Sequence, residues 1–316
     1  MAKTKQEHYV PQFYLRSFAD DTGYVWVYDK PEGKQFRTGV SNVAAESRFY
    51  DLPGSGDQPV EQRLAGIEAR VSPLLRELAG LFEASGEVRD DIRSQVAEFI
   101  ALQLLRTRKY RNMINELYPK AANDVRDWHS ADISGVDVGA IIDGMLQTTS
   151  EAETHEASMF AGETPKMIAD TFANMAWVLG AAAGDLLYTS DSPVVCHRYG
   201  DWSGASYMLA QPDTEVVFPL APDRLLLLRG DVPVKRESTP DGACVVLRAK
   251  DVKQYNRLQV RGSHRQVYCR RKEFNVAERL CTKDPALRDP NRQQVSMTRR
   301  RSPEGERPIL SPRRKW

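Results

Sequence analysis

Apolar residues recur at helical spacing through the first half of the chain. A helix is predicted from about Pro59, and Pro73 inside it predicts a kink or a division. A second helix is predicted over 88–128 with a break at Pro119, and a third from 164 to about 184. The apolar stripe of the first helix is formed by Leu64, Ile67, Val71, Leu74, Leu75 and Leu78.

Weaker helical periodicity is found over 136–159, and strand-like runs lie at both ends of the helical region. Tyr24–Asp29 is rich in β-forming residues, and 35–38 can return as the second strand of a hairpin. After Asp185, short apolar runs alternate with turn residues, which predicts strands. These runs are 186–195, 215–222, 224–230 and 243–249, followed by a helix at 251–262 and a last strand at 266–270.

This order of elements predicts the fold class and the domain organisation. Strands, then helices, then strands favour an α+β fold, with a central helical bundle packed against a small, mainly antiparallel sheet. We expect a single domain over residues 1–283, made of a strand segment at 8–50, a helical region at 59–184 and a C-terminal sheet and helix at 185–272. Residues 284–316 are rich in arginine and proline and poor in apolar residues, so we expect a disordered tail.

The net charge of +1 is distributed unevenly. Residues 284–316 hold nine Lys or Arg and four Asp or Glu, a net charge of +5, so the rest of the chain carries about −4. A body with this charge does not attract nucleic acid electrostatically. We therefore expect nucleic acid to bind through the basic tail alone, without sequence preference, while protein partners stay open.

Cysteine usage and hydropathy indicate the cellular compartment in which the protein is expected. The four cysteines form no CxxC pair, and neither a signal-peptide-like run nor an apolar stretch near the ~20 residues of a membrane span is found. Unpaired thiols without a secretion signal predict a cytoplasmic protein that does not bind membranes. The motifs GxxxxGK[ST], GxGxxG and HExxH are absent too, which argues against P-loop nucleotide hydrolysis and a zincin mechanism.

Several separated motifs carry a family resemblance. HYVPQFYLRSF, YVWVYDK, VAEFIALQLLRTRKYRN, YTSDSPVV, VVFPLAPDRLLLL and VKQYNRLQVRGSHRQVY occur in this order over roughly residues 6–272. Together they resemble the uncharacterised bacterial family filed as domain of unknown function 4238. The resemblance implies no settled reaction. It singles out His8, Tyr9, Pro11, Gln12, Glu68, Gln103, Arg106, Ser190, Asp191, Pro193, Asn256 and His264.

The first group of these residues combines an imidazole, a carboxylate and a guanidinium. His8 stands among aromatic and apolar neighbours, where it could act as an acid, a base or a metal ligand, or bond a backbone carbonyl as a core histidine. Glu61 and Glu68 share one side of their helix, and we expect Glu68 to turn inward and Glu61 to lie at the solvent boundary. Arg106, inside an apolar helix, needs Glu68, Asp191 or a bound anion as its partner.

The remaining polar residues have both a structural and a functional interpretation. Asp191 ends a strand, where it either forms an Asx turn or lies as a catalytic carboxylate at the mouth of a sheet. Asn256 and His264 are eight residues apart and share a helix face if the helix persists, although Gly262 could end it and leave His264 on the surface. Gln12 and Gln103 are expected to lie on the faces that carry His8 and Arg106.

Two functional hypotheses follow. The first is a hydrolase of phosphate esters, most plausibly a nuclease in bacterial defence or toxicity, a role suggested only by association. His8, Glu68, Asp191 and His264 would perform acid–base chemistry or hold a divalent metal, a cofactor whose identity stays open. The residues that would bind and orient the substrate are Gln12, Gln103, Arg106 and Asn256.

The second hypothesis is a non-catalytic protein that binds a ligand or a partner. In this case the same polar residues form a buried network that stabilises the fold or captures a small anion. A catalytic site requires His8 and a carboxylate to meet in an open cleft, whereas a structural network leaves them enclosed with every polar atom paired.

Overall fold

A computed structural model of the 316-residue chain describes residues 6–54, 58–84, 88–129, 149–198, 213–230, 240–292, 295–302 and 305–312. The helix predicted over 136–159 lies partly outside these residues. Within them, the α+β fold class is confirmed. The helical elements are α1 (Gln12–Arg16), η1 (Val40–Asn42), α2 (Pro59–Ala84), α3 (Asp90–Leu105), α4 (Arg108–His129), α6 (Glu151–Phe160), α7 (Thr164–Asn174), α8 (Ala249–Gly262), α9 (Asn275–Lys283) and η2 (Pro285–Arg288).

The strands form two main sheets and two small pairs. A five-stranded sheet has the order β10-β5-β9-β8-β7, with β10 parallel to β5 and the other neighbours antiparallel. An antiparallel four-stranded sheet has the order β3-β2-β11-β6, and β1-β4 and β12-β13 are two-stranded. The strands are β1 (Gln6–His8), β2 (Tyr24–Asp29), β3 (Lys34–Gly39), β4 (Ala45–Ser47), β5 (Ala176–Ala182), β6 (Thr189–Ser190), β7 (Val195–Arg198), β8 (Thr214–Ala221), β9 (Arg224–Arg229), β10 (Cys244–Leu247), β11 (Gln266–Cys269), β12 (Val295–Ser302) and β13 (Gly305–Pro312).

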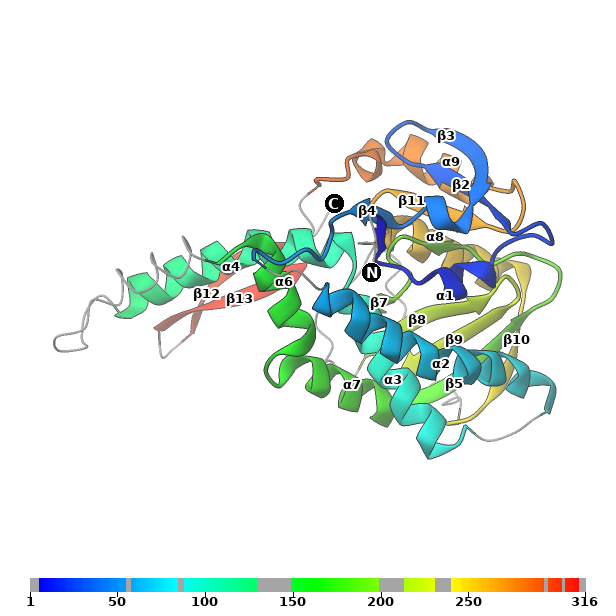
Figure 1. Ribbon diagram of the computed structural model, residues 1–316, viewed down its shortest axis with the longest axis horizontal. Helices are drawn as coiled ribbons and strands as arrows, with labels where there is room; N and C mark the ends of the chain where they lie inside the picture. The colour runs from blue at the N-terminus through cyan, green and yellow to red at the C-terminus, as the bar shows by residue number, and fades with distance from the viewer. Residues whose placement is uncertain are drawn as a thin grey trace.

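The five-stranded sheet is buried on both faces, which explains its continuous apolar runs. Trp177, Phe218 and Leu226 belong to the core shared with α2, α3 and α7, whereas Val217 and Leu225 belong to the core shared with α8. Neighbouring residues of one strand thus enter different cores, because successive side chains point to opposite faces. In Figure 1 the blue-cyan helices α2 and α3 lie across this sheet.

Helix α8 lies between the two main sheets. It contacts β7 and β10 of the five-stranded sheet and β6 and β11 of the four-stranded sheet, and Figure 1 shows it between them. Its residues Tyr255 and Leu258 pack in the core of the first sheet, and Val260 packs in the core of the second. The chain itself passes from one sheet to the other between β6 and β7, through residues 191–194.

The helices begin and end at other residues than the sequence pattern predicts. Pro73 and Pro119 lie inside α2 and α4, so neither proline divides its helix. The predicted long helix ends instead at Arg106, and Thr107 begins the next by accepting a hydrogen bond from the Tyr110 amide at 3.3 Å. An N-cap threonine therefore sets the boundary here.

The stretch Ala176–Ala182 is a central strand, although the sequence pattern assigns it to the helical region at 59–184. Its sequence AWVLGAA is continuously apolar, and periodicity cannot separate a buried strand from a buried helix in so short a run. Pairing with β9 on one side and β10 on the other, in parallel, decides in favour of the strand.

The folded body continues past residue 283, where the sequence pattern ends it. Leu287 of η2 is 5% exposed and packs with Phe274 and Cys281. Arg292 donates to the backbone carbonyls of Arg261 and Ser263 at 3.0 and 2.8 Å. The expectation of a disordered tail from residue 284 is therefore wrong for 284–292. Beyond them, β12 and β13 form a hairpin.

None of the described helices combines the length and the hydrophobicity that crossing a membrane requires.

Candidate acid–base site around Arg106

Arg106 is the centre of a polar cluster inside the protein. It follows α3 directly, and its side chain is 1% exposed. Its Nη2 donates to the backbone carbonyl of His8 at 2.6 Å, and its Nη1 lies 2.9 Å from Glu68 Oε1. One side chain thus joins α3, β1 and α2. A buried guanidinium requires such partners because its charge is costly to remove from water.

Two further contacts stabilise the cluster. Gln103, one turn before Arg106, donates from Nε2 to the Tyr9 carbonyl at 2.9 Å. The hydroxyl of Tyr50 donates to the Arg106 carbonyl at 3.2 Å. The carbonyls of His8 and Tyr9 therefore accept hydrogen bonds from Gln103 in α3 and from Arg106 directly after it, which orients the end of β1 relative to the helix.

Several buried atoms of the cluster have no hydrogen-bond partner among the described residues. They are His8 Nε2, Glu61 Oε1, Gln103 Oε1, Arg106 Nε and Arg106 Nη1. The Arg106 Nη1 contact with Glu68 is thus an ion pair without hydrogen-bond geometry. Since nearly all buried polar atoms in proteins are paired, this concentration of unpaired atoms makes the cluster the candidate functional site. We call His8, Glu61, Glu68, Gln103 and Arg106 the Arg106 site.

The carboxyl group of Glu61 titrates near neutrality. Burial raises its pKa from 4.5 to about 7, Arg106 opposes this rise, and Glu7 and Glu68 add to it. Burial also raises the pKa of Glu7, whose carboxylate accepts hydrogen bonds from the Tyr50 amide and from Gln58. A carboxyl group with a pKa near 7, such as that of Glu61, can donate and accept a proton at physiological pH.

The His8 imidazole is held neutral. Burial lowers its pKa, a hydrogen bond with the backbone of Ser41 opposes this, and the charges of Arg106 and Arg16 lower it further. His8 and Glu61 are both partly exposed, and Glu68 is 25% exposed, so water reaches the edge of the site. The Arg106 site therefore combines a neutral base, a weak acid and a buried cation.

Asp191 and His264 lie together after β6 and α8. Asp191 is 1% exposed, and its Oδ1 accepts the His264 amide at 2.8 Å. Its Oδ2 accepts the amides of Arg265 and Gln266 at 2.6 and 2.7 Å. Both oxygens are thus engaged by the loop after α8. Burial lowers the pKa of the His264 ring to about 4, although Asp191 acts in the opposite direction.

Three cations that the sequence pattern does not identify bind the C-terminal end of α8. Lys30 Nζ donates to the carbonyls of Val260 and Ser263 at 3.1 and 2.8 Å, and Lys109 Nζ donates to the Gly262 carbonyl at 2.9 Å. Arg292 supplies the third cation. Burial, and then the charge of Arg292, lower the pKa of Lys109 to about 7. Helix ends leave carbonyls unpaired and attract cations, so this cluster is explained by the fold.

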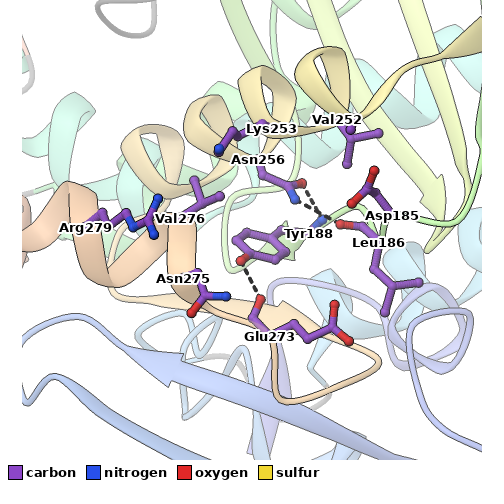
Figure 2. A pocket seen from close by; sticks show the side chains of 11 residues that line it. Asp185, Leu186, Tyr188, Val252, Lys253, Asn256, Glu273, Asn275, Val276 and Arg279 are labelled. Atoms are coloured by element: carbon purple, nitrogen blue, oxygen red, sulfur yellow. Dashed lines mark hydrogen bonds between the residues drawn. The ribbon is translucent and has the colours of Figure 1, made fainter.

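Asn256 and Gln12 occupy two further places. Asn256 accepts the Tyr188 amide at 2.7 Å and donates to the Leu186 carbonyl at 2.9 Å, as Figure 2 shows. It thereby connects α8 to the chain before β6. Gln12 lies on α1 and accepts a hydrogen bond from Arg16 at 3.1 Å. Of the four acid–base residues predicted from the sequence, Arg106 joins His8 and Glu68, and a hydrogen bond joins Asp191 to the His264 amide.

Sequence reasoning places Glu61 at the solvent boundary and Glu68 inward. The structure pairs Glu68 with Arg106 and leaves a buried Glu61 oxygen unpaired. The spacing of seven residues indicates that both glutamates share a helix face, but not which of them an arginine neutralises. Within the part of the chain that the structure describes, no group of three or more His, Cys, Asp or Glu is arranged to hold a metal ion.

The comparisons with known proteins give a family and no relative. Residues 6–273 match the family described as "Protein of unknown function (DUF4238)". Comparisons with curated proteins and with solved structures give no match.

Proposed function

The chain belongs to the DUF4238 family of proteins of unknown function, and from the Arg106 site we propose that it hydrolyses phosphate esters, with nucleic acid as the substrate class. The observation that carries this proposal is the Glu61 carboxyl group, whose pKa burial raises to about 7 and which interacts with the charge of buried Arg106. Arg106 also bonds the backbone carbonyl of His8, whose imidazole Nε2 has no hydrogen-bond partner among the described residues. Perturbed acids and bases of this kind concentrate at functional sites.

Each residue of the site has a distinct role in the proposed reaction. His8 Nε2 accepts a proton from a water molecule as its oxygen bonds to phosphorus. Glu61 donates its proton to the leaving oxygen as the phosphorus–oxygen bond breaks, and the two residues exchange the proton afterwards. The Arg106 Nε–H stabilises the charge that develops on the phosphoryl oxygens, while Glu68 holds the guanidinium in place.

Metal-independent chemistry fits this set of residues. A hydrolase that uses a divalent metal needs a group of carboxylate or histidine ligands, whereas the Arg106 site supplies its cation through an arginine. RNA is the expected substrate, because its 2′-hydroxyl can take the place of that water molecule. The hydroxyl then gives its proton to His8 Nε2 as its oxygen bonds to phosphorus, and Glu61 protonates the leaving 5′-oxygen as the chain breaks. A role in bacterial defence or toxicity is part of the proposal, and expression of the active protein is then expected to slow bacterial growth.

The test is cleavage of tRNA, rRNA and DNA by the purified protein, with EDTA and with added magnesium or manganese. We expect RNA cleavage that persists in EDTA and falls at least ~100-fold in Glu61→Gln and in His8→Asn, since general acid–base groups contribute roughly this much. The matched control is Glu98→Gln, an exposed glutamate of α3, which should cleave like the wild type. Cleavage of equal rate in all three variants would contradict the proposal.

A non-catalytic binding protein is the second candidate, and the saturation of Asp191 and Asn256 favours it. Both oxygens of Asp191 and both polar atoms of the Asn256 amide have protein partners, as expected of structural residues. If no substrate is cleaved but RNA or an anion protects the wild type against unfolding more than Glu61→Gln, this second candidate is favoured.

A further inference from the structure

A pocket of about 330 Å³, which shares no residue with the Arg106 site, is formed by the chain before β6, the first half of α8 and the start of α9. Figure 2 shows Tyr188 and Asn256 between these segments. Both residues are almost fully buried, and hydrogen bonds hold them in place: Asn256 bonds the backbone of Leu186 and Tyr188, and the Tyr188 hydroxyl donates to the Glu273 carbonyl. This part of the pocket is therefore preorganised.

Charged side chains of both signs line this pocket and lack ion-pair partners among the described residues. Lys253 of α8 and Arg279 of α9 lie toward one end, and Asp185 and Glu273 toward the other, as Figure 2 shows. All four are exposed, and no salt bridge within the described part of the chain joins them to one another. Each therefore keeps its charge available for a ligand.

The two cations lie one turn inside helices that begin at the pocket. Lys253 is the fifth residue of the 14-residue helix α8, and Arg279 is the fifth residue of the 9-residue helix α9. Two helices that each begin at the pocket and each carry a cation one turn later create a positive potential, which favours an anionic group of a ligand.

We propose that this pocket binds a small zwitterion of the size of a dipeptide, with its carboxylate at the Lys253–Arg279 end and its protonated amine at the Asp185–Glu273 end. Leu186, Val252 and Val276 supply apolar walls for an aliphatic side chain. The volume lies at the small end of the ~300–1,000 Å³ typical of ligand pockets, which suits such a molecule. The inference does not rest on the hydrolase proposed above.

The test is binding of the dipeptide Ala-Leu to the full-length protein, followed by NMR chemical shifts and calorimetry. We expect saturable binding that weakens at least ~10-fold for N-acetyl-Ala-Leu and for Ala-Leu amide, because each loses one charge-assisted contact. Arg279→Gln and Asp185→Asn should each lower the affinity by a similar factor. These side chains are exposed, so the variants should fold. Lys250→Gln, an exposed lysine of α8 that does not line the pocket, is the matched control.

Two results would overturn the inference. N-acetyl-Ala-Leu or inorganic phosphate binding as tightly as Ala-Leu would show an anion site without amine recognition. The absence of Ala-Leu binding at millimolar concentration, or equal binding by Arg279→Gln and Lys250→Gln, would show that the pocket does not recognise this class of ligand. Neither result depends on whether the protein cleaves RNA.

Discussion

At the scale of the residue, the structure separates polar side chains that the sequence cannot distinguish. The sequence around Asp191 is compatible with an Asx turn and with a catalytic carboxylate. In the structure its partners are the backbone amides of residues 264–266, more than seventy residues away. Glu61 is the opposite case, because burial leaves one of its oxygens without a partner among the described residues. Residue type indicates neither depth nor backbone partners, so neither outcome follows from the sequence.

The first prediction concerns Asp191→Asn, which removes one acceptor oxygen and the negative charge from three backbone amides. We expect the free energy of unfolding to fall by about 2–3 kcal/mol, because buried hydrogen bonds to a charged group are strong. Chemical denaturation measures this. Asp185→Asn, an exposed aspartate nearby in sequence, should change stability by less than ~0.5 kcal/mol. A catalytic Asp191 would instead lose activity at unchanged stability.

At the scale of the element, α8 connects the two main sheets. The sequence predicts it at 251–262, close to its observed bounds, because its pattern is amphipathic. The residues that bind its C-terminal end cannot be predicted from the sequence, since Lys30, Lys109 and Arg292 come from distant segments. The strand β5 is not predicted for a related reason. Its continuous apolar sequence results from burial on both faces, and only pairing with the neighbouring strands shows that it is a strand.

The second prediction concerns Gly262, the last residue of α8. A Cβ placed there would lie 2.6 Å from Cγ2 of Val195 in β7, so the helix and the strand approach closely. Gly262→Ala should therefore lower the free energy of unfolding by about 1–3 kcal/mol. Val195→Ala in the same chain should restore part of this loss.

Gly66 provides the matched control for this change. It lies inside α2, and a Cβ there would meet nothing within 4 Å. Gly66→Ala should raise stability by up to ~1 kcal/mol, because alanine is the better helix former. Equal effects of the two substitutions would show that the contact between α8 and β7 is not close.

At the scale of the whole molecule, two sheets share one helix and one junction. Residues 191–194 join the sheets, α8 packs between them, and the segment 284–292 covers the C-terminal end of α8. Most of these elements are predictable from the sequence. The predicted domain ends at residue 283, too early, because Leu287 and Arg292 alone do not distinguish a packed segment from the basic tail around them. The junction explains why the motif YTSDSPVV is so polar inside a core.

The third prediction compares two truncations. Removing 293–316 should leave the melting temperature nearly unchanged and weaken any retention of nucleic acid, since most of the tail's basic residues lie there. Removing 284–316 should also lower the melting temperature by several degrees, because Leu287 and Arg292 are lost. Identical melting curves for the two truncations would mean that 284–292 adds nothing to the folded body.

The proposed reaction depends on Glu61 being a carboxylic acid that titrates near neutral pH. An NMR titration of the glutamate side-chain carboxyl carbons, with Glu61→Gln to identify the Glu61 signal, measures it directly. We expect a pKa of about 7 for the Glu61 carboxyl group. Since the folded protein then holds a proton that the unfolded chain releases from about pH 4.5, this residue's contribution to stability should be lost between pH 4.5 and 7, and Glu61→Gln should remove that loss. A Glu61 pKa below about 5, near that of an ordinary glutamate, would show that Glu61 is ionised at neutral pH and cannot act as the proposed acid.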